Sequence, residues 1–181
     1  SSDVCSSDLS VCGALLAIAE LKLPVAVEAW APLAENMVSD TATRPSDIIT
    51  MYGGKTVEVL NPDAEGRLVL GDALVKAQEN KSLDAIIDVA TLTGAKMIAL
   101  GTRYSAVMTN NDQLCEEFLT ATKSTGEQFW QLPLPEELRQ SLDTPVADIA
   151  NIGDRNGGAL VAGLFLKEFI ANELQIGRAH V

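Results

Sequence analysis

Apolar and polar residues follow two alternating periods along the chain, one typical of amphipathic helices and the other of strands. The helical period predicts helices over residues 10–21, 68–78, 93–100, 111–123, 136–142 and 158–170. Short runs rich in β-branched residues predict strands over residues 25–31, 48–51, 56–60, 85–90 and 105–108. The glycines of residues 52–55 predict a hairpin turn. This alternation indicates an α/β fold with a mixed, largely parallel sheet covered by helices on both faces.

The composition is that of an acidic globular protein, with 47% hydrophobic residues, 21% charged residues and a formal net charge of −12. Such a charge disfavours contact with phosphate backbones, so nucleic acid is not indicated as a partner. The longest apolar stretch, residues 11–19, is too short to span a bilayer, and no membrane partner is expected. A nucleotide-binding module is a weaker hypothesis, because no phosphate-cradling glycine pattern follows a predicted strand.

Both ends of the chain match one DNA sequence read on opposite strands. The codons AGT TCA GAC GTG TGC TCT TCC GAT, followed by CT, encode residues 1–8 and open the codon of Leu9. The reverse complement, read as ATC GGA AGA GCA CAC GTC TGA, encodes residues 176–181 and then a stop. This DNA resembles a sequencing-library adapter, so we expect residues 1–9 and 176–181 to be non-native. Genomic DNA that continues with the same codons would contradict this expectation.

The histidine and cysteine content limits the chemistry of the remaining chain. The one histidine, His180, lies in the suspect tail, so a His-based triad and a His-ligated metal are excluded from residues 10–175. Cys12 and Cys115 lie in apolar helical patterns and are expected to be buried free thiols. No disulfide framework is indicated, which favours a reducing, cytoplasmic compartment.

A loop with two acids and an arginine follows the strand predicted over residues 56–60. In an extended loop the side chains of Asp63 and Glu65 point the same way, and their repulsion would be removed by a divalent cation such as Mg²⁺, Mn²⁺ or Zn²⁺. Ligands of open α/β sheets bind where this loop would lie, outside the carboxyl ends of strands. Alternatively, the acids only favour the start of the next helix, by about 0.3–1 kcal/mol. Spacing alone leaves both interpretations open.

The sequence NPDAEGRL at residues 61–68 resembles the signature NTDAEGRL of the leucyl aminopeptidase (cytosol aminopeptidase) family. Other segments resemble family segments in the family's order: APLAENM at 31–37, RPSD at 44–47, GGKTVEVL at 53–60, DVATLTGA at 88–95, MTNND at 108–112 and ADIANIG at 147–153. Residues 10–175 are therefore identified as part of a leucyl aminopeptidase catalytic domain. The resemblance implies a zinc-exopeptidase-like fold, truncated at both ends.

The resemblance also implies a function: release of N-terminal amino acids, with a preference for leucine, through a dinuclear metal site and metal-bridged water. Asp63 and Glu65 match metal-ligating carboxylates, and Asp63 is also placed near the amino end of the substrate. Arg67 matches the catalytic arginine that holds a bicarbonate ion. Since a guanidinium stays protonated, Arg67 acts by holding an anion or stabilising a gem-diolate. The substrate-binding segment is matched by Thr91, Leu92 and Gly94.

The cofactors and partners implied by the resemblance are two divalent ions (Mn²⁺ or Zn²⁺, with Mg²⁺ as a further candidate), bicarbonate at Arg67 and peptide substrates with a free N-terminus. The resemblance further implies a homo-hexamer in the cytoplasm. Asp72, in the helix that follows the signature, is expected to be structural.

Two departures from the family pattern bear on activity. Pro62 stands where the signature has threonine, which removes a backbone donor and a hydroxyl, although a strand exit tolerates proline. The family's remaining ligands and its catalytic lysine belong before the helix that starts near Ser10. Asp3 and Asp8 lie in the adapter-like segment and are not assigned as ligands. We therefore expect this chain itself to be inactive, and the alternative for the parent protein is a non-catalytic relative that serves as a binding or assembly scaffold.

Overall fold

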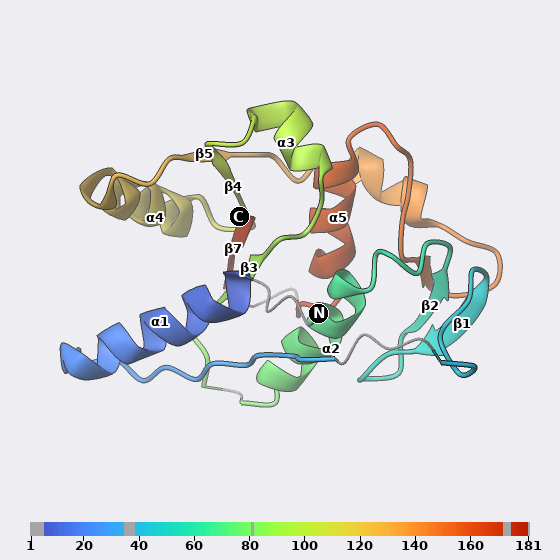
Figure 1. Cartoon of the computed structure of the whole chain (residues 1–181), viewed down its shortest axis with the longest axis horizontal. Coiled ribbons are helices and arrows are strands. Elements are labelled where there is room, and N and C mark those ends of the chain that lie inside the picture. Colours follow the sequence, from blue (N-terminus) through green and yellow to red (C-terminus); the bar gives the residue numbers. More distant parts are fainter. Residues whose placement is uncertain (1–5, 35–38, 81, 172–174, 181) are drawn as a thin grey trace.

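The computed structural model describes residues 6–34, 39–80, 82–171 and 175–180 of the chain (Figure 1). Its helices are α1 (Ser6–Glu20), α2 (Gly66–Ala77), α3 (Ala95–Leu100), α4 (Asp112–Thr125), the 3₁₀ helix η1 (Glu136–Leu142) and α5 (Gly158–Lys167). Its strands are β1 (Asp47–Thr50), β2 (Thr56–Val59), β3 (Ala85–Ala90), β4 (Ser105–Thr109), β5 (Phe129–Gln131), β6 (Ile149–Ala150) and β7 (Gln175–His180). None of the helices in these ranges is long and apolar enough to cross a membrane.

The strands form two mixed sheets, which confirms the α/β fold, although a single sheet was predicted. The three-stranded sheet has the order β1-β2-β6, with β1 and β2 antiparallel around the predicted hairpin turn and β2 parallel to β6. The four-stranded sheet has the order β3-β7-β4-β5, in which β7 runs parallel to β3 and antiparallel to β4. Helix α1 contacts β3, whereas α4 contacts β4 and β5.

The core lies between the three-stranded sheet, α2, η1 and α5. The fully buried side chains of this core include Val57, Val59, Leu142, Ile149, Leu164, Phe165 and Leu166. Each such side chain contributes about 1.5–3 kcal/mol relative to an exposed one. The apolar helix predicted over residues 158–170 is therefore confirmed as α5. Its buried side chains pack against β2, the strand that leads into the acidic loop.

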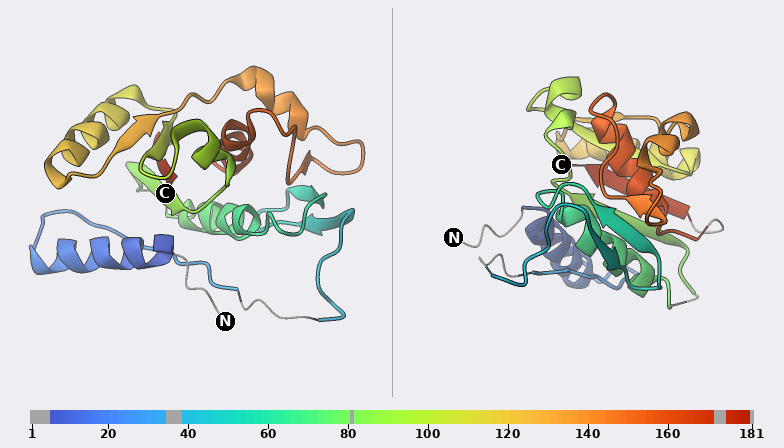
Figure 2. Two further views of the ribbon diagram at one scale, coloured as in Figure 1. Left: turned by 45° about the horizontal axis from the view of Figure 1, so that its top comes forward. Right: turned by 90° about the vertical axis from the view of Figure 1, so that its right-hand side faces the viewer.

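Two predictions made from the apolar pattern are wrong. Residues 25–31 form no strand, because no neighbouring strand in the described ranges pairs with them, and Val25 and Val27 are exposed. Cys12 is exposed rather than buried, while Cys115 is buried as predicted. Both errors have one cause, since α1 and the chain that follows it lie at the outside of the molecule (Figure 2).

The suspected adapter-derived residues take part in regular structure at both ends. Residues 6–9 begin α1, and β7 fills the space between β3 and β4. Ladder hydrogen bonds are made by backbone groups, so this pairing does not depend on which side chains β7 carries. The non-native origin of these residues stays a prediction.

Candidate active site

The loop that leaves β2 is a tight turn that presents both acids to solvent. The side-chain Oδ1 of Asn61 accepts the backbone N–H of Asp63 at 3.0 Å, and its carbonyl accepts the N–H of Ala64 at 3.1 Å. Pro62 lies between Asn61 and Asp63. Neither of these two hydrogen bonds uses the backbone N–H of residue 62, so the proline leaves both unaffected. Asp63 and Glu65 are both exposed.

Helix α2 begins directly after this turn, with Glu65 as its N-cap residue. The carbonyl of Glu65 accepts the N–H of Leu68 at 2.9 Å, but its side chain makes no capping hydrogen bond. The carboxylate is therefore not used to cap the helix. The oxygens of Glu65 are therefore not occupied by a capping bond and are available to a ligand, while the favourable effect of acids near a helix start remains open.

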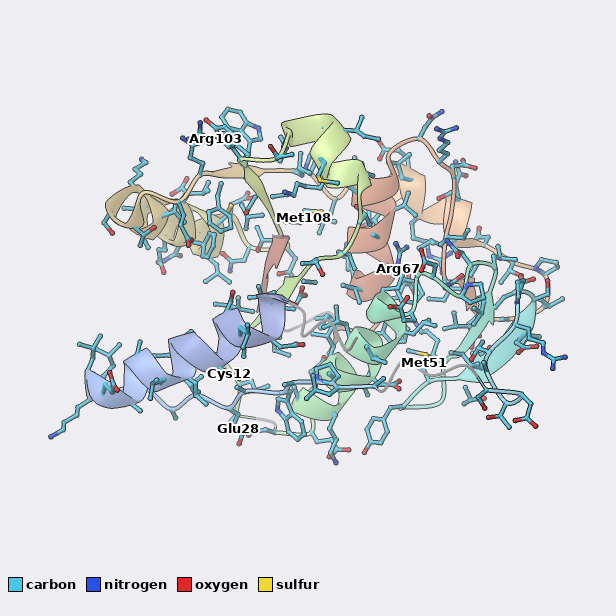
Figure 3. The ribbon with its side chains drawn as sticks, in the orientation of Figure 1. Cys12, Glu28, Met51, Arg67, Arg103 and Met108 are labelled. Carbon is cyan, nitrogen blue, oxygen red and sulfur yellow. The ribbon has the colours of Figure 1, made fainter. Side chains whose placement is uncertain are left out.

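Arg67 is buried in the first turn of α2, at the point where α2 meets α5 (Figure 3). Its Nη1 donates to the carbonyl of Asn151 at 2.9 Å, and its guanidinium carbon lies 5.9 Å from the centroid of the Phe165 ring. Burial lowers the pKa of the Arg67 guanidinium to about 10. It therefore remains protonated at neutral pH and cannot act as a general base. Its Nε is buried and has no hydrogen-bond partner among the described residues, so it retains a donor for an anion.

A cavity of about 220 Å³ collects most of the predicted site residues. It is lined by the start of α2, by the end of β3 and by the first turn of α1. The predicted residues in this lining are Asp63, Glu65, Arg67, Thr91 and Leu92. Asp8, from the adapter-like segment, lies in the same lining, while Asp3 lies outside the described residues.

Gly94 is the one predicted site residue that does not line this cavity. It is the N-cap residue of α3, and its carbonyl accepts the N–H of Met97 at 3.1 Å. The chain passes from β3 to α3 through residues 91–94, so Thr91 and Leu92 meet the cavity before Gly94 is reached. Its predicted role in binding peptide stays a prediction.

The side chains at the cavity are of the type that binds a divalent cation, but they are too few to bind one alone. Asp63 and Glu65 supply hard oxygen donors, which suit Mg²⁺, Mn²⁺ or Zn²⁺. Within the part of the chain that the structure describes, no group of three or more histidine, cysteine, aspartate or glutamate side chains could hold a metal ion. The two acids would therefore share an ion with ligands from elsewhere.

Sequence reasoning missed Asn151 and assigned Asp72 correctly. The side chain of Asn151 holds the backbone at the exit of β2, and its carbonyl holds Arg67. The only sequence signal for it was its place in the ADIANIG segment, which carries no chemistry by itself. The carboxylate of Asp72 accepts a hydrogen bond from the backbone N–H of Tyr52 at 2.7 Å. This bond connects the hairpin to α2, in agreement with the structural role expected for Asp72.

Comparison with known proteins places the chain in one family. The model of the cytosol aminopeptidase family, catalytic domain, matches residues 4–181. The probable cytosol aminopeptidase of Streptomyces avermitilis is 58% identical over 165 residues, which are 91% of this chain and 32% of that protein. The probable cytosol aminopeptidase of Streptomyces coelicolor is 57% identical over 161 residues, which are 89% of this chain and 31% of that protein. The chain thus spans about a third of the length of these relatives.

Solved structures give the same assignment. A mutant of tomato leucine aminopeptidase superposes with a TM-score of 0.78 at 46% identity, over 81% of this chain and 29% of that chain. The bottromycin maturation enzyme BotP, solved in complex with Mn, superposes with a TM-score of 0.92 at 39% identity, over 96% of this chain and 39% of that chain. The chain belongs to the cytosol aminopeptidase family, as part of its catalytic domain.

Proposed function

We propose that this chain is a portion of a metal-dependent aminopeptidase, which releases N-terminal amino acids from peptides. The observation that carries the proposal is that Asp63, Glu65 and Arg67 line one cavity in a member of this family. The two carboxylates suit a reaction in which a metal ion must be held. The buried guanidinium beside them suits a reaction in which developing negative charge must be stabilised. Leucine preference, a hexameric assembly and a cytoplasmic location are further parts of this proposal.

Asp63 and Glu65 are the residues that would hold the divalent ions, with Mn²⁺ or Zn²⁺ as the favoured metals. The solved structure of BotP is a complex with Mn, which supports manganese as a candidate here. When bound, such ions polarise a carbonyl and lower the pKa of water toward neutrality. Asp63, which lines the cavity, would also contact the α-amino group of a peptide, as the family resemblance implies.

Arg67 would hold an anion, bicarbonate in this proposal, or stabilise the charge that develops on the scissile carbonyl. Its guanidinium is fixed by Asn151 and Phe165, and its Nε retains an unused donor. A preorganised donor in a buried place is worth more than the same donor in water. Thr91, Leu92 and Gly94 would bind the peptide from the segment after β3.

A full-length protein that carries this chain tests the proposal. The double substitution Asp63→Asn with Glu65→Gln should abolish manganese binding, measured by calorimetry, and hydrolysis of a leucyl amide. Asp112→Asn with Glu116→Gln removes the same charges from exposed positions of α4 and should leave both unchanged. The full-length protein could bind neither manganese nor zinc, or the double variant could bind as much metal as the wild type. In either case a non-catalytic binding or assembly scaffold would replace the enzyme as the preferred function.

The chain as it stands should show no activity, because among its described residues no three histidine, cysteine, aspartate or glutamate side chains are grouped so that they could hold a metal ion. The assay is hydrolysis of a leucyl amide by the purified chain with added manganese. Measurable manganese-dependent turnover would contradict this expectation.

A further inference from the structure

Asn151 follows β6 directly and has 0% of its surface exposed. Its backbone N–H donates to the carbonyl of Glu58 at 2.9 Å, which extends the pairing of β2 with β6. Beyond this point the side chain replaces the strand as hydrogen-bond partner. Its Oδ1 accepts the N–H groups of Leu60 and Asn61 at 2.9 and 3.2 Å, and its Nδ2 donates to the carbonyl of Asn61 at 2.6 Å. One amide thus satisfies the backbone at the place where β2 becomes the acidic loop.

The same residue also holds the guanidinium on the other side of the site. The backbone carbonyl of Asn151 accepts Nη1 of Arg67 at 2.9 Å, and both residues are buried. Hydrogen bonds are strong in such a place, and an unpaired group there is costly. The start of the acidic loop and the cation in α2 therefore share one anchor, although Asn151 is 84 residues away from Arg67 in the chain.

We infer that Asn151 is a positioning residue of this site, which sets the spacing between the acids of the loop and the guanidinium of Arg67. The inference rests on the proposed function, because the spacing matters only if Asp63 and Glu65 bind metal while Arg67 holds an anion. An asparagine with a purely structural role would stabilise the sheet and leave the affinity for metal unchanged.

No other small side chain reproduces this set of bonds. Aspartate has the same shape but lacks the Nδ2 donor, so a carboxylate oxygen would face the carbonyl of Asn61 and repel it. Serine is the milder change, since its hydroxyl can replace only part of the three side-chain bonds. Both variants should therefore move the loop in the same direction, aspartate more than serine.

The test compares these two variants with two controls in the full-length protein. Asn156→Asp makes the same chemical change at an exposed position of the following loop. Val59→Ala removes packing from the fully buried end of β2 without touching a bond of Asn151, and so serves as a structural control. Three quantities are measured for each: the melting temperature, amide hydrogen exchange of the metal-free protein, and manganese affinity together with kcat and KM.

Asn151→Asp should speed exchange of the Leu60 and Asn61 amides at least tenfold relative to the β1 amides. It should also weaken manganese binding and lower kcat by about 10–100-fold, as for other groups that orient ligands. Asn151→Ser should show smaller changes of the same sign. Val59→Ala should lower the melting temperature but leave manganese affinity and kcat within about twofold, and Asn156→Asp should change nothing.

Two outcomes count against the inference, and they are distinguishable. A wild-type protein that binds no manganese and hydrolyses no leucyl amide would overturn the proposed function and this inference with it. A wild-type protein that binds manganese, but in which the Asn151 variants match Val59→Ala in affinity and kcat at equal loss of melting temperature, would overturn the inference alone.

Discussion

Helices α1 and α5 are both strongly apolar in sequence, yet one is exposed and the other is buried. In α5, Leu164, Phe165 and Leu166 are 0–1% exposed. In α1, Leu9 and Leu16 are 63% and 61% exposed. The helical pattern predicts both elements equally well, so the difference arises from what lies against them. The three-stranded sheet, α2 and η1 cover α5, whereas α1 contacts little more than β3.

The apolar pattern alone therefore does not tell which of the two helices is covered. Helix α5 is covered by other described residues of this chain, so its apolar side chains find their partners here. Helix α1 instead exposes its leucines, and Val25, Val27 and Trp30 of the following segment are exposed as well. Surfaces of this kind favour association or aggregation, so solubility should be limited by α1 and stability by α5.

The largest expected effect comes from truncating one large side chain in each helix. Phe165→Ala should lower the free energy of unfolding by about 3–5 kcal/mol, because it opens a cavity at a fully buried position. Leu16→Ala should change it by no more than about 0.5 kcal/mol, since the side chain already meets solvent. Urea unfolding followed by circular dichroism measures both. Equal losses would show that α1 is covered in solution.

An ion-pair network on α5 gives the second effect. Glu168, next to the end of α5, accepts hydrogen bonds from Lys55 and Arg139, each at 2.8 Å. Burial alone would raise the pKa of Glu168, but the bonds from Arg139 and Lys55 outweigh it and hold the pKa below its ordinary value. Among the described residues, α1 takes part in no ion pair of this kind.

Glu168→Gln should therefore lower the free energy of unfolding at pH 7 by about 1–2 kcal/mol. Because the folded pKa lies below the unfolded value of about 4.3, this stability is present above that pH and is lost as the pH falls through the folded pKa. The difference between wild type and variant should shrink between pH 7 and pH 3 in urea titrations. Glu20→Gln makes the same change at an exposed position of α1 and should show no such difference.

Sequence predicted the local elements well because they depend on neighbouring residues. The strand expected over residues 85–90 has those bounds in the structure, and the acidic loop lies between a strand and a helix as expected. The placement of the cavity lining was partly predictable for the same reason, since Thr91 and Leu92 follow a strand end. Chemistry carried by motif residues was thus accessible from the sequence.

Long-range pairing could not be predicted in the same way. Asn151 bonds residues 84 to 93 positions earlier, and nothing in its immediate neighbours signals that. The strand expected over residues 25–31 failed because a strand exists only with a partner, which the local pattern does not specify. The prediction that Cys12 is buried was wrong because an apolar helix is buried only where other elements cover it.

The smallest expected effect is also the sharpest comparison, because one substitution should have opposite signs in the two helices. A Cβ on Gly163 of α5 would lie 2.7 Å from Sδ of Met108 and 2.8 Å from Cδ2 of Leu134, whereas a Cβ on Gly13 of α1 would meet nothing within 4 Å. Alanine favours a helix interior over glycine by about 0.8–1 kcal/mol, but overpacking costs about 1–3 kcal/mol. Gly163→Ala should therefore destabilise the chain by about 1 kcal/mol in urea unfolding, and Gly13→Ala should stabilise it by somewhat less. A loss in both variants would mean that α1 has a close neighbour in solution, and the contrast between the helices would then disappear.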